Sequence, residues 1–230
     1  MSEEGTHILT DFQRALDGLT KSLNEMADLV RRNLDLAIRG LMERDSTLCA
    51  QVIADDEEVD TLEIRIDEEG LKTIMLYQPV ASDLRRVVST MKVSSNLERV
   101  GDQAVGIAKR ARRMNRNPAI PETRLVEPVY ERAAQLLRVS LDAFREGRVD
   151  EALGVKEQDA ELDKLYKSAS KKVTSRMDED KEHLKDYLDL QFIMRFLERV
   201  GDHAKNISED AVFVEAGMDI RHGGERPSVD

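Results

Sequence analysis

Four pairs of carboxylates are the residues of this sequence whose type and spacing best suit a chemical task. Two pairs lie inside a six-residue stretch, LERVGD, which occurs at Leu97–Asp102 and again at Leu197–Asp202. Each copy is preceded by a further pair, in ADDEEVD and in QDAELD. The pairs are Asp56 with Asp60, Glu98 with Asp102, Asp159 with Asp163, and Glu198 with Asp202. Residues four apart lie on the same side of a helix, so two neighbouring helices can present four carboxylates to one cation.

The predicted ligand set contains only oxygen donors, and this selects among metal ions. Carboxylates favour hard cations such as Mg²⁺, Mn²⁺, Ca²⁺ and iron, whereas a structural zinc site is built from Cys and His. Like charges four residues apart repel each other, and a bound cation reverses the sign of that interaction. A ferritin-like di-iron centre requires two Glu-x-x-His motifs. The sequence has none, and Asp180-x-x-His183 is a single imperfect approximation.

The alternative to a metal site is a solvated acidic face, because paired acids on an exposed helix usually serve solubility alone. The apolar stripe of the first motif runs through Leu97, Val100 and Ala104, and Glu98 and Asp102 point away from it. We therefore expect the acids in a groove or on an outer face. Two observations favour a site: both copies repeat the same Arg and Gly, which solvation does not require, and both have a second acid pair upstream.

Three other residue types in or beside the motif have two interpretations each. Gly101 and Gly201 interrupt predicted helices, where glycine costs about 0.8–1 kcal/mol relative to Ala. They allow either the close approach of a neighbouring helix or the access of a ligand to the backbone. Arg99 and Arg199 are either surface partners of nearby acids or anion-binding groups. His203 is either an ordinary polar residue or an occasional metal contact.

Long helices must position these acids. Apolar residues recur at three- and four-residue steps over most of the chain. The pattern breaks at Pro79, after which Ser82 or Asp83 can cap a new helix, and again in residues 115–121, which contain two prolines. The expected helices are Thr6–Arg44, Thr47–Leu76, a third from Ser82 or Asp83 to near Arg113, Glu122–Glu146, Val149–Asp178 and Lys181–Ala216.

Three helices followed by three more indicate a duplication. Besides LERVGD, both copies have Ala two residues after the Asp and Ile five residues after it, so eight positions match without a gap. Internal repetition of this kind marks repeated structural units. We predict an all-α fold of two tandem three-helix bundles related by internal duplication. The first bundle covers residues 1–115, the second residues 122–216, and a C-terminal tail residues 217–230.

Composition and charge narrow the function classes. Hydrophobic residues make up 40% of the chain and aromatic residues 4%, which is typical of a helical bundle. The net charge of −11 argues against binding nucleic acid, because such proteins concentrate Lys and Arg against the phosphate backbone. We recognise no signal peptide and no apolar run near the roughly 20 residues of a transmembrane segment, and the single Cys49 cannot form an internal disulfide. We expect a cytoplasmic protein.

The sequence also lacks the motifs of covalent catalysis. It has no Gly-rich phosphate loop, no Ser/His/Asp arrangement and no Cys nucleophile with a suitable partner. We therefore expect that the protein is not an enzyme.

Four stretches together resemble one known family. They are QPVASDLR at Gln78–Arg85, NLERVGDQAVGIAKRA at Asn96–Ala111, FLERVGDHAKNISEDAVF at Phe196–Phe213 and GMDIRH at Gly217–His222. In this order they resemble the PhoU family of phosphate-transport accessory proteins, over both halves and nearly the full length.

The resemblance implies a PhoU-like protein that negatively regulates the bacterial phosphate-starvation response and phosphate uptake. It implies an adaptor that links the phosphate transporter, through its ATPase subunit PstB, to the sensor histidine kinase PhoR. It also implies a homodimer that meets the inner face of the membrane through its partners.

Some members of the family carry multinuclear metal clusters on E(D)xxxD motifs. Matched residue by residue, these motifs fall on Asp56/Asp60 with Glu98/Asp102, and on Asp159/Asp163 with Glu198/Asp202. The implied cofactors are divalent or ferric ions, and iron, magnesium, manganese and zinc all stay open. Two other functions also stay open: a metal-storage or metal-buffering protein, and a purely structural helical protein whose acids keep it soluble.

The two copies differ at positions next to the motif. Gly106 stands where the second copy has Asn206, and Asn96 stands where it has Phe196. The segment corresponding to QPVASDLR in the second half is the less typical KEHLKDYL, at Lys181–Leu188. If one site is weaker, these differences do not say which.

Overall fold

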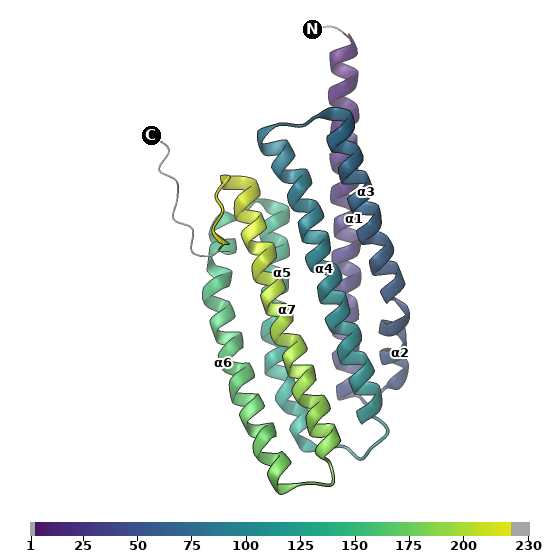
Figure 1. The fold of residues 1–230 in the computed structure, drawn as a ribbon, viewed down its shortest axis with the longest axis vertical. Helices are drawn as coiled ribbons and strands as arrows, with labels where there is room; N and C mark the ends of the chain where they lie inside the picture. The colour runs from purple at the N-terminus through teal and green to yellow at the C-terminus, as the bar shows by residue number, and fades with distance from the viewer. Residues whose placement is uncertain (1–2, 222–230) are drawn as a thin grey trace.

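Two helical bundles lie side by side with their long axes close to parallel (Figure 1). The structure is a computed structural model that describes residues 3–221, with side chains from residue 10 onward. The first bundle contains α1 (Glu3–Met42), α2 (Ser46–Ala54), α3 (Asp56–Tyr77) and α4 (Ala81–Met114). The second contains the 3₁₀ turn η1 (Pro121–Val126), α5 (Glu127–Glu146), α6 (Val149–Glu179) and α7 (Leu184–Ala216). Residues 3–221 include no strand, and the predicted all-α fold of two duplicated bundles is confirmed.

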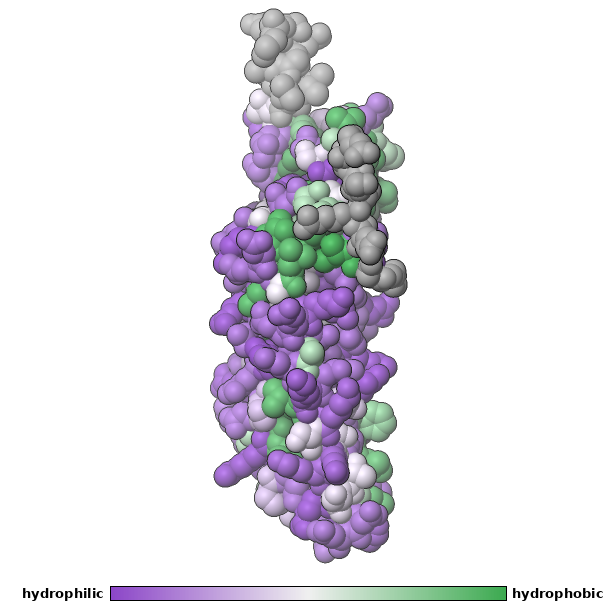
Figure 2. Space-filling model, turned by 90° about the vertical axis from the view of Figure 1, so that its left-hand side faces the viewer, coloured by the Kyte–Doolittle hydropathy of each residue, from purple (hydrophilic) through white to green (hydrophobic). Residues whose placement is uncertain are grey.

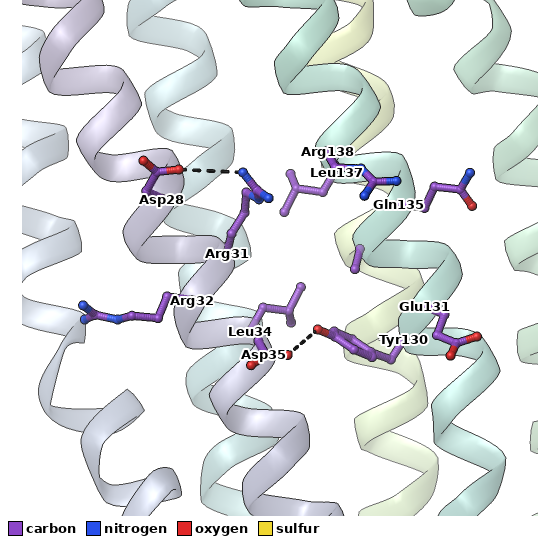
Figure 3. A pocket seen from close by; sticks show the side chains of 11 residues that line it. Asp28, Arg31, Arg32, Leu34, Asp35, Tyr130, Glu131, Gln135, Leu137 and Arg138 are labelled. Atoms are coloured by element: carbon purple, nitrogen blue, oxygen red, sulfur yellow. Dashed lines mark hydrogen bonds and ion pairs between the residues drawn. The ribbon is translucent and has the colours of Figure 1, made fainter.

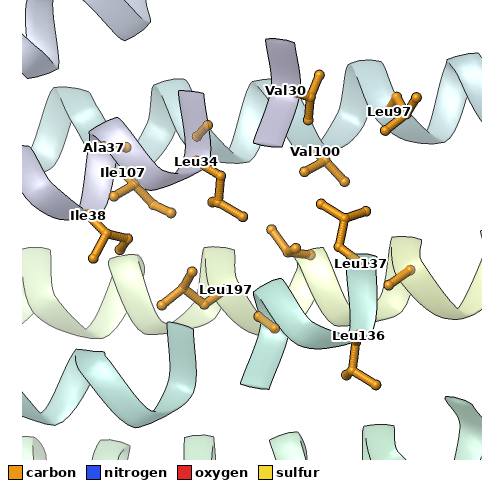
Figure 4. Packing of buried hydrophobic residues seen from close by; sticks show 14 of the residues in the cluster. Val30, Leu34, Ala37, Ile38, Leu97, Val100, Ile107, Leu136, Leu137 and Leu197 are labelled. Carbon is orange, nitrogen blue, oxygen red and sulfur yellow. The ribbon is translucent and has the colours of Figure 1, made fainter. Parts of the chain in front are cut away.

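The core runs through the middle of both bundles. Helices α4 and α7 lie at the centre, where each packs against its own bundle and against the other. Side chains from α1, α4, α5 and α7 fill the interior between them (Figure 4). The predicted stripe is fully buried, including Leu97 and Val100 of α4 and Leu197 and Val200 of α7. Burial of each such side chain contributes about 1.5–3 kcal/mol, so the stripe fixes which side of α4 and α7 remains for the acids.

The single helix predicted over Thr47–Leu76 is wrong, because the chain breaks into α2 and α3 at Asp55. The Asp55 carbonyl accepts hydrogen bonds from the N–H of Glu58, three residues onward, at 3.2 Å and from the N–H of Val59, four residues onward, at 3.4 Å. Arg32 of α1 donates to the Asp55 carboxylate at 2.8 Å and holds the junction in place. As a result Asp56 lies in the first turn of α3, where the helix dipole favours negative charge.

Helix α4 begins before both predicted capping residues, Ser82 and Asp83, so that prediction is also wrong. Its first residue is Ala81, and no side chain caps it. The turn is made instead by Gln78, whose left-handed backbone (φ 47°) ends α3. Pro79 follows and cannot donate to the turn before it.

In the second bundle, α5 and α7 both begin later than predicted. Helix α5 begins at Glu127, after η1, because Pro128 has no N–H to donate to the preceding turn. Helix α7 begins at Leu184 instead of Lys181. The turn before it is held by the Asp180 carboxylate, which accepts two backbone N–H groups at 3.2 and 3.3 Å.

The chain leaves α7 through Gly217, whose φ of 67° suits glycine. Met218 and Ile220 then pack back against the core. The remainder of the predicted tail, residues 222–230, lies outside the described residues, and so does His222 of the GMDIRH stretch.

Helices α4 and α7 run antiparallel along the seam between the bundles. Asn206 of α7 donates a hydrogen bond to Asn96 of α4 at 3.2 Å, and Phe196 of α7 packs on Gly106 of α4. Position 96 matches position 196 in the repeat, and position 106 matches 206. Across the seam, each of these positions of one copy therefore meets the partner position of the other copy, which is the arrangement that an approximate twofold axis produces.

Candidate metal centres

The first carboxylate cluster lies between α3 and α4. Asp56 and Asp60 come from α3, and Glu98 and Asp102 come from α4. Burial raises the pKa of the Asp56 carboxyl, and repulsion from Asp60 and Asp102 raises it further. Burial also raises the pKa of Glu98, with added repulsion from Asp102 and Asp60. The four acids that the sequence groups in the first half therefore share one electrostatic environment.

The second cluster repeats this arrangement between α6 and α7. Burial raises the pKa of Asp159; Lys205 opposes the shift, and Asp202 and Asp163 add to it. The pKa of Glu198 is also raised, by burial first and then by Asp202, with a smaller contribution from Asp163. The four acids predicted in the second half are thus brought together as well.

Each cluster contains a glutamate whose carboxylate is largely removed from water. The side chains of Glu98 and Glu198 are 17% and 15% exposed, whereas Asp102 is 46% exposed. The Oε2 atoms of both glutamates are buried and form no hydrogen bond with the described residues. A buried carboxylate oxygen that accepts no hydrogen bond costs about 1–3 kcal/mol. Within the acid pairs on α4 and α7, the glutamate is the less exposed member and the aspartate the more exposed one.

A basic side chain neutralises part of the first cluster. Arg99 Nε lies 3.2 Å from the Glu98 carboxylate, without the geometry of a hydrogen bond, and Arg99 Nη1 lies 3.3 Å from Asp102. This confirms the interpretation of Arg99 as a surface partner of the neighbouring acids.

The second cluster is neutralised by different residues. Arg195 lies 3.0 Å from Glu198, and Lys205 lies 3.7 Å from Asp159. In the side-chain conformations described for residues 10–221, no three carboxylate, imidazole or thiolate groups converge as a metal site requires. The donors fit a hard cation in type. Coordination by four of them requires these ion pairs to open and the carboxylates to change rotamer.

The two motif glycines allow close helix packing, and that interpretation is confirmed. A Cβ at Gly101 would lie 3.2 Å from Cγ1 of Val59. A Cβ at Gly201 would lie 2.3 Å from Cδ2 of Leu162 and 3.2 Å from Oδ1 of Asp159. The glycines therefore bring α3 and α6, with their acids, against α4 and α7.

His203 lies at the seam and is partnered there. Its Nδ1 is 3.1 Å from the Asn96 side-chain oxygen, and burial lowers the pKa of its imidazole. This supports the interpretation of His203 as an ordinary polar residue.

Sequence reasoning missed the other charged residues that act on the clusters. Glu63 adds to the repulsion that raises the pKa of Glu98, and Lys205 and Arg195 neutralise the second cluster. Glu63 follows Asp60 at three-residue spacing, which is a helical signal. The two basic residues have no counterpart of the same charge in the first copy, where Val105 and Ser95 stand.

A separate cavity of about 530 Å³ lies between α1 and α5, away from the helix pairs that carry the clusters (Figure 3). Its charged walls pair with each other. Tyr130 donates a hydrogen bond to Asp35 at 3.0 Å, and Arg31 lies 3.7 Å from Asp28. The walls hold arginines and carboxylates in equal number, so the cavity has no clear preference for a charged ligand.

Among the described residues, no helix has the length and apolar character needed to cross a membrane.

Comparison with known proteins gives matches over both bundles. The PhoU domain family model matches residues 23–111 and 127–211. The chain is 36% identical to a phosphate-specific transport system accessory protein PhoU homolog from Pseudomonas putida, over 95% of this chain and 86% of that protein. It is 34% identical to the accessory protein PhoU of Serratia marcescens, over 95% of this chain and 90% of that protein.

Solved structures give the same result. The crystal structure of PhoU from Pseudomonas aeruginosa superposes with a TM-score of 0.87 at 33% identity, over 90% of this chain and 100% of that one. The PhoU structure from Streptococcus pneumoniae has a TM-score of 0.83 at 27% identity, over 91% of this chain and 99% of that one.

The family model matches once in each bundle and covers the helix pairs that carry the acids. The family consists of non-catalytic accessory proteins, which confirms that the chain is not an enzyme. Duplicated bundles, repeated motif and sequence identity agree, and the chain belongs to the PhoU family.

Proposed function

We propose that this chain negatively regulates the phosphate-starvation response and phosphate uptake. It acts as an adaptor between the phosphate transporter ATPase and its sensor histidine kinase. The observation that carries the proposal is the family match across both bundles, whose relatives are named phosphate-specific transport system accessory proteins. An adaptor needs separate contact surfaces on a stable scaffold, and two long bundles joined along one seam supply them. The proposal includes a cytoplasmic location and a homodimeric state.

The same proposal assigns the two carboxylate clusters to divalent or ferric metal ions. Its support is the buried Oε2 atoms of Glu98 and Glu198, which accept no hydrogen bond from the described residues and recur at matching places in the two bundles. A cation bound there would coordinate both oxygens and reverse the repulsion among the acids. Asp56, Asp60 and Asp102 would complete the first site; Asp159, Asp163 and Asp202 would complete the second.

Deletion of the gene, followed by a phosphatase reporter at high phosphate, tests the regulatory role. Loss of a negative regulator should raise reporter activity, and reintroduction of the gene should restore repression. Pull-down of the purified chain with the cytoplasmic part of the kinase, and separately with the transporter ATPase, tests the adaptor role. Reproducible absence of binding to both proteins, at high and at low phosphate, would overturn it.

Elemental analysis tests the metal assignment on protein purified without chelator. Wild type should retain metal above background, and the double variant Glu98→Gln/Glu198→Gln should lose most of it. The matched control is Glu57→Gln/Glu157→Gln, which removes two exposed acids from α3 and α6 outside the predicted ligand set. Equal metal content in all three proteins would refute the assignment. Turnover of ferrous iron by the loaded wild type would instead support a metal-storage function.

A further inference from the structure

The outer side of α3 carries a row of exposed apolar side chains. Ile64, Leu71 and Met75 are 58%, 54% and 71% exposed. Their spacing of seven and four residues places them on one side of the helix, opposite its buried face. Val80 in the following turn and Leu84 in the first turns of α4 are also exposed, at 74% and 37%. Contiguous exposed apolar residues mark interaction surfaces, whereas single ones are common on any protein.

The second bundle provides an internal control for this row. Val59 packs on Gly101 and Leu162 packs on Gly201, so these contacts fix the register between α3 and α6. In that register the positions of Ile64, Leu71 and Met75 correspond to Lys167, Thr174 and Asp178, all exposed. The side of the molecule that carries α6 is mostly hydrophilic, with apolar residues in separate patches (Figure 2). The fold therefore does not need an apolar residue at any of the three positions.

The charge around the row also differs between the copies. Helix α3 has eight acidic and two basic residues, whereas α6 has eight acidic and six basic ones. Glu68, beside the row, corresponds to Lys171 in α6. Within the described part of the chain, Asp67 and Glu68 form no ion pair that would neutralise them. An apolar row bordered by unneutralised carboxylates is complementary to apolar side chains bordered by Lys or Arg.

We propose that the α3 row, defined as Ile64, Leu71 and Met75, is the docking surface for an amphipathic helix of a partner protein. The partner helix presents an apolar face flanked by Lys or Arg. The inference rests on the proposed adaptor function and names the surface through which one partner binds. The distance from Ile64 to Met75 is about 17 Å at 1.5 Å per residue, so a helix of about three to four turns covers it. Helices bind such surfaces through residues at three- and four-residue spacing.

Other occupants fit the charges less well. A bacterial membrane surface is anionic, and it repels a chain of net charge −11 whose α3 is its more acidic outer helix. The same surface of a second copy is equally acidic, so a symmetric contact through this row would oppose like charges. The basic amphipathic helix is the occupant that satisfies both the apolar row and its border.

The test uses a labelled model peptide of Leu and Lys, about 18 residues long, with Leu at positions i, i+3, i+4 and i+7 of each repeat. Binding to the full chain is measured by fluorescence anisotropy at several salt concentrations. The triple variant Ile64→Lys/Leu71→Thr/Met75→Asp places the residues of α6 on α3. The matched control Leu153→Thr/Leu188→Thr removes two exposed apolar residues elsewhere, at 43% and 45% exposure. A peptide of the same composition in scrambled order reports binding by charge alone.

We expect the triple variant to bind the peptide at least tenfold more weakly than wild type does, while the affinity of the control variant stays within twofold of wild type. The scrambled peptide should bind wild type at least tenfold more weakly than the ordered peptide does. Equal binding by wild type and triple variant, or by both peptides, overturns the proposal. So does self-association of wild type that the triple variant abolishes, or binding to anionic vesicles that it abolishes. Thermal unfolding of each variant verifies that it is folded.

A second arm separates this proposal from the proposed function. In the phosphatase reporter strain, the triple variant should derepress as the deletion does, and the control variant should not. If the deletion derepresses and the triple variant does not, the adaptor works through another surface and the docking proposal fails alone. If the deletion itself leaves the reporter repressed, the regulatory function fails, and the peptide measurement still decides whether the surface binds a basic helix.

Discussion

The ring of Phe196 lies where a side chain at position 106 would have to be, because a Cβ built on Gly106 would come within 2.8 Å of its ring carbons. At the mirrored place on the seam, Asn206 donates to Asn96 at 3.2 Å. Two of the positions at which the copies differ, 96/196 and 106/206, are therefore partners across one interface. At one end of the seam an aromatic ring packs on a glycine, and at the other end two side-chain amides form a hydrogen bond. The difference concerns contact between the bundles and leaves the acids of both clusters unchanged.

Alanine at the two motif glycines should affect stability to different extents. Gly101→Ala gains helix propensity of about 0.8–1 kcal/mol and meets Val59 at 3.2 Å, so its free energy of unfolding should change by less than about 1 kcal/mol. Gly201→Ala meets Leu162 at 2.3 Å, and such overpacking costs about 1–3 kcal/mol. Urea unfolding of both variants measures the difference. Equal free energies of unfolding would show that α6 shifts at no cost.

Removal of the buried glutamate charges should stabilise the protein in chelator. Glu98 and Glu198 each have one buried carboxylate oxygen that accepts no hydrogen bond from the described residues, and the pKa of each is raised by burial and by a neighbouring aspartate. In EDTA, Glu98→Gln/Glu198→Gln should gain about 1 kcal/mol per site. Added metal should raise the melting temperature of wild type and leave this variant unchanged. A lower stability of the variant in EDTA, with the Glu57→Gln/Glu157→Gln control unchanged, would contradict this account.

Asp210 should make stability fall as pH rises between about 4 and 6. Burial raises its pKa to about 6 from 3.8, against the attraction of Lys92, whose Nζ lies 3.7 Å away. Because the pKa of Asp210 is higher in the folded state, the unfolded state loses this proton first as pH rises. The free energy of unfolding therefore falls as pH rises from about 4 to about 6. Asp210→Asn should remove that loss, on the order of 2–3 kcal/mol. The free energy of unfolding at pH 4, 5, 6 and 7 measures this loss. If it changes with pH in the same way for the variant and for wild type, the prediction is wrong.

Asp189 should be a major determinant of the seam. It lies 8% exposed and accepts hydrogen bonds from Arg110 at 2.7 Å and from Arg113 Nε at 3.1 Å. Asp189→Ala leaves both guanidinium groups without their shared partner and should cost about 2–4 kcal/mol in urea unfolding. Asp178→Ala, an acid 87% exposed and 3.5 Å from Lys181, should change stability by less than about 0.5 kcal/mol. Similar effects in both variants would show that the seam does not depend on Asp189.

Most of the helices were readable from the sequence because burial imposes a period of 3.6 residues, which Leu97, Val100 and Ala104 display. The errors fall at helix ends, which depend on single hydrogen bonds instead of on a repeated pattern. At the break, Asp55 pairs with Arg32, a residue of another helix. The late start of α5 was visible in principle, since Pro128 is in the sequence.

The duplicated all-α fold and the pairing of the eight acids along their helices were readable from the sequence, because the repeat, the apolar stripe and the four-residue spacing are local properties of the chain. Only the tertiary structure shows that one carboxylate oxygen of Glu98 and of Glu198 is buried, which basic residues neutralise each cluster, and that Gly106 and Phe196 meet. These facts depend on which helices pack together and in what register. Residues brought together from distant parts of the chain leave no periodic signal in the sequence.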